Sequence, residues 1–302
     1  MLKEYEKKVF VSKEGLCSNE IPSISVYGNN LAEAWETALL ATYEYGCSMP
    51  TEYDQEIDPE SRDATMMITV ANPFAEPRIH KCLPCGYDDL EIYRQEVVNG
   101  VSDYKVGSGG WSYSYHDRMF GWPGIGSSTK LGDLIGKDIV FPNINQIEIL
   151  INNLAKTPYS RRAEAITWFP FVDAQHHEPP CFQRLWCRII NAGHDKYMLE
   201  MNTHWRSRDA LKAAFMNFYA FTDLQRVIAD RISEVSGKVI GVGRYVDISD
   251  SYHIYGSYIR KGEMDKILSS IKNMPLSKRT VRSDHPAVLM EFERARKKLE
   301  SD

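Results

Sequence analysis

The chain has 302 residues, of which 43% are hydrophobic and 25% charged, and its formal net charge is −5. This composition excludes an intrinsically disordered chain, which would have fewer apolar residues and usually a larger net charge. The mild acidity also argues against nonspecific nucleic-acid binding, which needs a basic face.

The first half of the chain alternates helical and strand-like patterns. Residues 30–45 have apolar side chains at helical spacing, whereas 65–70 is rich in β-formers. Residues 88–99 are predicted to form a helix that Gly100 ends, and 143–153 another. Turn-forming residues predict loops over 48–63, 107–110 and 120–128.

The second half contains longer patterns. Strands are predicted over 163–172, 182–191, 197–205 and 245–255. The longest helical pattern covers 210–235, and 291–302 is predicted to be a charged, solvated helix or tail. Strands and helices mix without strict βαβ alternation, so we predict an α+β fold with a mixed, mostly antiparallel sheet flanked by helices. We expect one domain over 1–302, because the predicted loops lie close to patterned segments.

No apolar run approaches the roughly 20 residues of a membrane span, and the N-terminus lacks a signal-peptide core. We therefore expect a cytoplasmic protein without membrane contacts. In that reducing compartment the cysteines should be free thiols; they are residues 17, 47, 82, 85, 181 and 187. Cys82 and Cys85 form a CxxC, which could be a redox pair or half of a zinc site. No second CxxC completes a zinc site, so we interpret them as ordinary cysteines and expect no metal.

One cysteine stands in a distinctive context. Pro179 and Pro180 precede Cys181 and would hold its backbone at a fixed angle before a predicted strand. By itself this signal is weak, because an isolated cysteine is more often a buried apolar residue.

Three polar segments accompany Cys181. The segment 206–209 reads Arg-Ser-Arg-Asp and suits a phosphate, although it could equally be a charged turn capped by its Asp. The helix that follows carries Asn217, and a later predicted strand places His253 and Tyr255 on one face. Upstream, 161–162 is a pair of arginines.

Together, and in this order, these segments resemble the thymidylate synthase superfamily, which includes the pyrimidine nucleotide hydroxymethylases. The resemblance covers about residues 160–256, with one extra residue between Asp250 and His253. It implies a Cys181 nucleophile and an Asn217 that reads the pyrimidine. It implies a homodimer formed through the sheet, in which arginines reach the partner's site. The residues that it implies for nucleotide binding are Arg206, Ser207, Asp209, His253, Tyr255, Arg161 and Arg162.

The N-terminal half matches the superfamily more loosely. Arg62 corresponds to an early phosphate-binding arginine, and Tyr115 to the tyrosine near the catalytic cysteine. Lys81 and Glu91 lie ten residues apart, like the folate-side lysine and the proton-handling glutamate of the family. Glu96 is the rival for that carboxylate, and we favour Glu91.

The implied chemistry is one-carbon transfer from 5,10-methylenetetrahydrofolate to C5 of a pyrimidine nucleoside monophosphate. A thiolate that adds at C6 turns C5 into an enolate-like nucleophile. Asn217 can offer a donor and an acceptor to the ring edge, and a carboxylate would relay protons. On the folate side the resemblance implies Lys81 and Asp209, and Trp111 would stack on the pterin or the ring, although such aromatic residues are more often core.

Two products are compatible with this chemistry. The attached carbon becomes methyl by hydride transfer or hydroxymethyl by addition of water, and reduction requires a dry site. The glycine-rich stretch 107–110, Trp205 and Arg208 beside the Arg-Ser pair, and the charged C-terminal extension depart from the synthases. They favour hydroxymethylation of a uridylate or cytidylate, with thymidylate synthesis as the alternative. A nucleotide-binding homologue without catalysis is the remaining alternative, and the presence of Cys181 and a carboxylate argues against it.

Overall fold

A computed structural model describes residues 8–12, 20–125, 127 and 142–301. Cys17, predicted to be a free thiol, lies outside the described residues; the other five cysteines are free thiols. The strands are β1 (Val9–Val11), β2 (Ser23–Gly28), β3 (Cys47–Met49), β4 (Ser61–Val70), β5 (Ile79–His80), β6 (Glu164–Ile166), β7 (Phe182–Asn191), β8 (Tyr197–Asp209), β9 (Ile240–Ile254) and β10 (Thr280–Val281).

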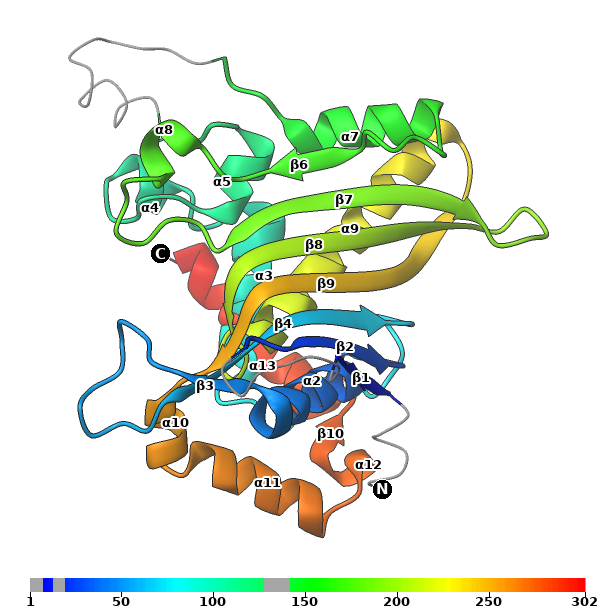
Figure 1. The fold of residues 1–302 in the computed structure, drawn as a ribbon. Helices are drawn as coiled ribbons and strands as arrows, with labels where there is room; N and C mark the ends of the chain where they lie inside the picture. Colours follow the sequence, from blue (N-terminus) through cyan, green and yellow to red (C-terminus); the bar gives the residue numbers. More distant parts are fainter. Residues whose placement is uncertain (1–7, 13–19, 126, 128–141, 302) are drawn as a thin grey trace. The chain divides into compact units, whose positions relative to one another are not determined.

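The helices vary widely in length, and several are single turns (Figure 1). They are α2 (Leu31–Tyr45), α3 (Tyr87–Asn99), α4 (Tyr104–Gly107), α5 (Tyr115–Phe120), α7 (Gln146–Lys156), α8 (Pro170–Asp173), α9 (Ala214–Ser236), α10 (Gly256–Arg260), α11 (Glu263–Asn273), α12 (Leu276–Arg279) and α13 (Pro286–Ser301).

Eight strands form one open sheet in the order β1-β2-β4-β9-β8-β7-β6, with β3 beside β4, and β10 pairs with β5 separately. The β2–β4 pair is parallel, whereas β1–β2, β3–β4, β4–β9 and β6–β7 are antiparallel. The prediction of an α+β fold with a mixed, mostly antiparallel sheet is therefore confirmed. By its internal contacts the chain divides into two compact units. Unit 1 comprises residues 1–90, 205–219 and 244–297, and unit 2 comprises 91–204, 220–243 and 298–302.

Unit 1 is built around α2, which packs on β2 and β4 (Figure 1). Asn30 caps the helix by accepting a hydrogen bond from the backbone N–H of Glu33 at 3.0 Å. Trp35 is wholly buried, and its indole N–H donates to the carbonyl of Ala210 at 2.8 Å. Gly28 allows α2 to approach β2 closely, because a Cβ there would lie 2.6 Å from Ala34.

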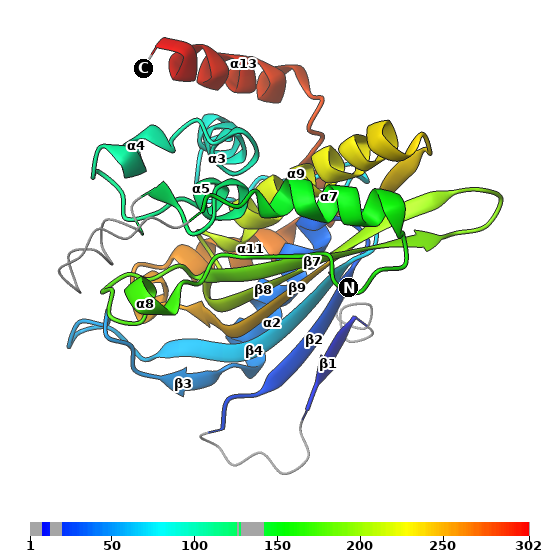
Figure 2. The ribbon, with the colours of Figure 1, turned by 90° about the horizontal axis from the view of Figure 1, so that it is seen from above.

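In unit 2, helix α7 packs on β6 and β7 (Figure 2). Its apolar stripe is buried, as the helical spacing of 143–153 predicted. The predicted helix over 88–99 is α3, and Gly100 ends it with a positive φ of 65°. Unit 2 therefore contains helices close to where the sequence predicts them.

Several predictions of secondary structure were wrong in extent. The predicted strand over 65–70 is part of β4, which starts at Ser61 inside the predicted loop over 48–63, and the predicted strand over 245–255 is part of β9, which starts at Ile240. The predicted strand over 163–172 is only β6, because Pro170 starts the short helix α8 at a position where its fixed φ is favourable. The predicted turn at 206–209 is instead the end of β8. The C-terminal segment was predicted to be either a solvated helix or a tail, and it is the helix α13. Because α13 buries Val288 and Phe292, it is amphipathic and not fully solvated.

Candidate functional site

The end of β8 in unit 1 carries the predicted phosphate-binding segment. Arg208 is buried and forms an ion pair with the wholly buried Asp247 at 2.6 Å, and its guanidinium lies 3.6 Å from the ring centroid of Trp205. A guanidinium held in this way has a structural role. Of the two arginines in the segment, only the half-buried Arg206 remains a candidate for a phosphate, next to the half-buried Ser207.

Asp209 ends β8 and holds the turn into α9. Its Oδ1 accepts hydrogen bonds from the backbone N–H groups of Leu211 and Lys212, both at 2.9 Å. Its Oδ2 accepts a hydrogen bond from the Tyr258 hydroxyl at 2.6 Å. Burial, reinforced by the Asp209 charge, raises the pKa of Tyr258, so this hydroxyl stays a donor. The predicted capping role of Asp209 is confirmed, while its role toward substrate or folate stays a prediction.

His253 and Tyr255 lie where β9 ends. Tyr255 follows the strand instead of lying on it, yet its ring centroid is 4.6 Å from that of His253. The Nδ1 of His253 lies 3.2 Å from the Ser251 hydroxyl, which donates to Asp63 at 2.8 Å. The buried Nε2 of His253 has no hydrogen-bond partner among the described residues.

Burial lowers the pKa of His253, so its imidazole is neutral near pH 7. A neutral imidazole with an unpartnered buried nitrogen is suited to a hydroxyl group of a ligand, because it exchanges hydrogen bonds with neutral groups at little electrostatic cost. The backbone of Arg62 lies beside the C-terminal end of β9, where Ile254 is its register partner, so its side chain is on the face opposite to that of His253. We call Arg62, His253 and Tyr255, together with Arg206 and Asp209, the β8–β9 cluster, and a shared role of Arg62 with His253 stays a prediction.

Two further predicted residues of unit 1 have clear positions. Asn217 lies near the start of α9 and is only 6% exposed. Lys81 follows β5, is exposed, and donates from Nζ to the carbonyl of Lys278 at 3.0 Å. It lines a cavity of about 470 Å³ together with Arg282 and His285. Because the Arg282 guanidinium pairs with Asp284 at 2.6 Å, Lys81 is the basic side chain of this cavity that has no acidic partner among the described residues.

In unit 2, Cys181 immediately precedes β7 and is half-buried. The Tyr115 hydroxyl accepts a hydrogen bond from the backbone N–H of Phe182, the residue that follows Cys181, and the ring centroids of Tyr115 and Phe182 lie 5.6 Å apart. Burial raises the pKa of Tyr115 well above its usual value, and a negative charge at Cys181 adds to this effect. Tyr115 therefore lies next to the backbone at Cys181, and its role toward the thiol stays a prediction.

A cavity of about 240 Å³ in unit 2 is lined by Tyr115, Glu96, Trp111, Tyr113 and Tyr93 among others. Glu96 is half-buried and accepts a hydrogen bond from the Ser102 hydroxyl at 2.9 Å. Burial raises the pKa of Glu96. With Cys181 and the residues of this cavity, we call the group the thiol cluster.

Glu91 is placed differently from its rival. It is wholly buried, and its carboxylate accepts hydrogen bonds from Arg94 at 2.7 and 2.6 Å and from Gln95 at 2.9 Å. Arg94 also lies 4.0 Å from Asp223. Glu91 is thus part of an ion-pair network within unit 2, whereas Glu96 lines the cavity that Tyr115 lines.

The paired arginines Arg161 and Arg162 precede β6, and both are exposed. The backbone carbonyl of Arg161 accepts a hydrogen bond from the Trp186 indole at 3.1 Å, which fixes the chain at this position. Their side chains are accessible on the surface of unit 2, as a contact with a partner subunit would require.

Two residues that contact the β8–β9 cluster could not be predicted from sequence. Tyr258, on α10, lies 49 positions from the Asp209 carboxylate to which it donates. Asp63 lies 188 positions from Ser251, and the pairing of β4 with β9 brings the two together. Among the described residues, no helix has the length and apolarity to cross a bilayer, and no group of three His, Cys, Asp or Glu side chains is arranged to hold a metal ion.

Comparison with known proteins gives consistent matches. Residues 105–294 match the family model described as thymidylate synthase. The chain is 25% identical over 232 residues to a Methanosarcina mazei protein, covering 76% of this chain and 88% of that protein. It is 27% identical over 231 residues to a Methanocaldococcus jannaschii protein, covering 75% and 88%. Both proteins carry the curated name "Putative thymidylate synthase".

Among solved structures, thermostable thymidylate synthase A from Bacillus subtilis is similar, with a TM-score of 0.52 over 78% of this chain and 84% of that chain. The sequence identity of this pair is 17%. The likeness therefore concerns the fold, and it agrees with the open α+β sheet described above.

Proposed function

Because the chain belongs to the thymidylate synthase family, a family of one-carbon transferases, we propose that it transfers a one-carbon unit to C5 of a pyrimidine nucleoside monophosphate through a covalent adduct of Cys181. The observation that carries the proposal is the half-buried thiol beside Tyr115 at the start of β7. A thiol that is accessible and held next to a neutral hydroxyl suits reversible addition to a ring.

In the proposed reaction, the Cys181 sulfur bonds to C6 of the pyrimidine and the ring gains electron density at C5. Asn217 would bind the ring edge, and the donor and acceptor of its amide serve uracil directly. Tyr115, kept protonated by burial, supplies a neutral hydroxyl next to the sulfur. C5 bonds to the carbon carried by methylenetetrahydrofolate and loses its proton, and the bond from that carbon to the folate nitrogen breaks as tetrahydrofolate leaves. Water then adds to the exocyclic methylene, the C6–S bond breaks, and the thiolate is restored.

For the carboxylate that relays protons, the geometry favours Glu96. Its pKa is raised by burial, which brings a carboxyl group closer to a working pH at which it can both give and take a proton. Glu91 is instead held by Arg94 and Gln95. We therefore propose Glu96 as the proton relay, and the role of Glu91 stays a prediction.

The β8–β9 cluster would bind the rest of the nucleotide. Arg206 and Ser207 suit the phosphate, with Arg62 as a further guanidinium. The unpartnered Nε2 of His253 and the Tyr255 hydroxyl suit the sugar hydroxyls. The resemblance to the family supports each of these roles, and the partial or complete burial of the side chains in unit 1 agrees with them.

The co-substrate would be methylenetetrahydrofolate, which supplies the carbon at the oxidation level of formaldehyde. The residues present fit this molecule. Trp111 and Tyr113 line an aromatic cavity suited to a pterin ring, and the ammonium of Lys81 at a second cavity suits a carboxylate.

For the product, we propose a 5-hydroxymethyl nucleotide. Residues 107–110 are all exposed and Trp111 is 37% exposed, so water has access to this edge of the aromatic cavity. The C-terminal segment forms α13 instead of an apolar tail that would exclude water. Thymidylate is the second candidate, and the curated names of the relatives favour it.

Product analysis tests the proposal. The protein is incubated with methylenetetrahydrofolate and, separately, with dUMP, UMP, dCMP or CMP, and the nucleotides are analysed by mass spectrometry. A hydroxymethyl gain on one nucleotide supports the full proposal, and a methyl gain supports the chemistry with the other product. No gain on any of the four would contradict it.

We also propose a homodimer in which Arg161 and Arg162 of one protomer bind the phosphate in the partner's site. Mixing Arg161→Ala protein with Cys181→Ser protein tests this, because each variant alone should have little activity. Mixed dimers hold one intact site each, so about a quarter of wild-type activity should return after subunit exchange. A mixture that stays as inactive as its components would contradict the shared site.

A further inference from the structure

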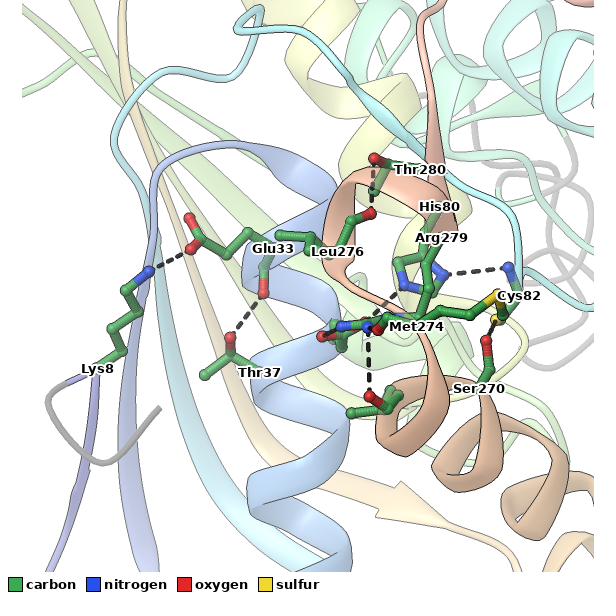
Figure 3. Close-up of polar contacts among 12 residues, drawn as sticks. Lys8, Glu33, Thr37, His80, Cys82, Ser270, Met274, Leu276, Arg279 and Thr280 are labelled. Carbon is green, nitrogen blue, oxygen red and sulfur yellow. Dashed lines mark hydrogen bonds and ion pairs between the residues drawn. The ribbon is translucent and has the colours of Figure 1, made fainter. Parts of the chain in front are cut away.

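Unit 1 contains two buried histidines, and they differ in how their ring nitrogens are held. Nε2 of His80 lies 2.8 Å from the Glu36 carboxylate, which also accepts a hydrogen bond from Nε of Arg279 at 2.7 Å (Figure 3). Nδ1 of His80 accepts a hydrogen bond from the backbone N–H of Cys82 at 3.1 Å. Both ring nitrogens of His80 therefore have partners within the protein, which indicates a structural role.

The second histidine, His253, is held on one side of its ring only. It is 6% exposed, and its Nε2 has no hydrogen-bond partner among the described residues. A buried polar atom without a partner costs free energy, so native proteins nearly always satisfy it. Because His253 belongs to the β8–β9 cluster, a ligand atom can be that partner. The kind of atom depends on which ring nitrogen of His253 carries the proton.

The pairing of β4 with β9 brings together the groups that decide this. Asp63 on β4 is the register partner of His253 on β9, so the two side chains lie on the same face of the sheet. Ser251 precedes His253 by two residues. Its hydroxyl donates to Oδ2 of Asp63 at 2.8 Å, and its oxygen lies 3.2 Å from Nδ1 of His253. Ser251 therefore connects the carboxylate to the imidazole.

The single hydroxyl proton of Ser251 determines the tautomer of His253. Because this proton is donated to Asp63, the Ser251 oxygen can offer only a lone pair to Nδ1, and Nδ1 must carry the hydrogen. The backbone carbonyl of Ser251 also accepts a hydrogen bond from the ring, and this bond comes from Nδ1 too, since Nε2 has no partner. In the neutral ring, Nε2 is therefore a hydrogen-bond acceptor.

We propose that Asp63 and Ser251 are positioning residues that make Nε2 of His253 an acceptor, and that this nitrogen selects nucleotides whose sugar presents a free 3′-hydroxyl. A hydroxyl can donate to Nε2, whereas a fluorine or a phosphate ester at the same carbon has no proton to donate. The sugar preference rests on the nucleotide binding proposed above. The tautomer of His253 does not, because contacts within the protein set it.

The tautomer is measured first, on the full chain without nucleotide. In ¹⁵N-labelled protein, correlations between the ring nitrogens and the carbon-bound ring protons distinguish a protonated from an unprotonated nitrogen, and His253→Gln identifies the His253 signals. Burial raises the pKa of Asp63, so the spectra are recorded at pH 8, where its carboxyl is ionised. We expect a protonated Nδ1 and an unprotonated Nε2. A protonated Nε2 in the wild type would overturn the proposal.

The sugar preference is measured by calorimetry. Of dUMP, UMP, dCMP and CMP, the nucleotide that binds most tightly is compared with its 3′-deoxy-3′-fluoro analogue. The wild type should bind the hydroxyl form about tenfold or more tightly, because the analogue leaves Nε2 buried without a donor. Equal affinities would overturn the preference. If none of the four binds although Nδ1 is protonated, the assigned tautomer holds and the proposed function fails.

Asp63→Ala tests the cause of the tautomer. Without the carboxylate, the Ser251 hydroxyl can turn its proton toward Nδ1, so a protonated Nε2 should become detectable and the preference for the hydroxyl form should shrink at least about threefold. A purely structural role of Asp63 would weaken both ligands equally and leave their ratio unchanged, and that result in a folded variant would contradict the positioning role.

Asp265→Ala is the matched control, because it removes an exposed carboxylate from α11 of the same unit. It should keep both the tautomer of His253 and the ratio of the two affinities. If Asp63→Ala does not fold, the wild-type spectrum and the wild-type preference decide the proposal.

Discussion

The β8–β9 cluster of unit 1 and the thiol cluster of unit 2 differ in how their carboxyl groups are held. In the first, Asp209 accepts hydrogen bonds from two backbone amides and from Tyr258, and the adjacent Arg208 is paired with Asp247. In the second, Glu96 is half-buried and its pKa is raised. A carboxylate held by several hydrogen bonds, as Asp209 is, is suited to a fixed position beside a ligand, whereas a buried carboxyl with a raised pKa is suited to proton transfer.

This difference predicts a division of kinetic effects. Changes in the thiol cluster should lower kcat, because its groups act on the reacting ring. Changes in the β8–β9 cluster should raise KM, because its groups bind parts of the nucleotide that do not react. A thiol-cluster variant that raises only KM, or a β8–β9-cluster variant that lowers only kcat, would contradict this comparison.

The largest effect is expected from Cys181→Ser. A serine hydroxyl is a much weaker nucleophile than a thiolate near neutral pH, so turnover should fall by roughly 10⁴-fold or more. Nucleotide affinity, measured by calorimetry, should change less than about threefold. The matched control is Cys187→Ser, whose sulfur is wholly buried in β7 and takes no part in the proposed reaction. Near wild-type turnover in Cys181→Ser would contradict the mechanism.

Next is Glu96→Gln, which should lower kcat by about 10²- to 10⁴-fold and remove the limb of the pH–rate profile that reports this carboxyl. Burial raises the Glu96 pKa, so the ionised form costs stability, and this cost grows as pH rises through the unfolded value. The substitution should therefore raise Tm at pH 7 but not at pH 4.

Glu91→Gln provides the contrast to Glu96→Gln. It removes the charge that pairs with Arg94 inside unit 2, so the free energy of unfolding should fall by about 3–5 kcal/mol, while the folded protein keeps its pH–rate profile. Measured kcat and Tm of the two variants separate the roles. If the pH–rate profile changed only in Glu91→Gln, Glu91 and not Glu96 would be the carboxylate that relays protons.

A smaller effect is expected from Arg206→Ala. Loss of a charge-assisted hydrogen bond to phosphate costs about 1.5–3 kcal/mol, so KM for the nucleotide should rise about 10- to 100-fold with little change in kcat. Arg260→Ala is the matched control in unit 1, because Arg260 pairs with Asp58 at the surface. A drop in kcat at unchanged KM would place Arg206 with the groups that act on the ring.

The smallest effect is expected from Tyr258→Phe. It removes one of the hydrogen bonds to Asp209, so the free energy of unfolding should fall by about 1–2 kcal/mol. Because the backbone bonds to Leu211 and Lys212 remain, KM should change less than about threefold. Chemical denaturation and steady-state kinetics measure both quantities. A KM increase comparable to that of Arg206→Ala would show that Tyr258 itself binds substrate.

The sequence predicted those parts of the fold that local rules determine. The helix over 30–45, the stop at Gly100 and the run of β7 all depend on neighbouring residues, and each was confirmed. The extent of β6 and of β8 was not predicted correctly, because tertiary pairing and Pro170 decide where those strands end.

For the candidate site, motifs located the residues but not their partners. Nothing near Arg208 in the sequence shows that its guanidinium pairs with Asp247, and the choice between Glu91 and Glu96 depends on which carboxylate an arginine occupies. Some of these contacts join residues on different elements, and others depend on the direction in which a side chain points. Neither can be deduced from the spacing of residues along the chain.

The central claim is that the Cys181 sulfur adds to C6 of a pyrimidine and thereby activates C5. The direct measurement is release of tritium from 5-³H-labelled dUMP and CMP into water, in the presence of methylenetetrahydrofolate, by wild-type protein and by Cys181→Ser. We predict release from at least one nucleotide with the wild type and none above background with the variant. Equal release by the two proteins, or no release from either nucleotide by the wild type, would contradict the account.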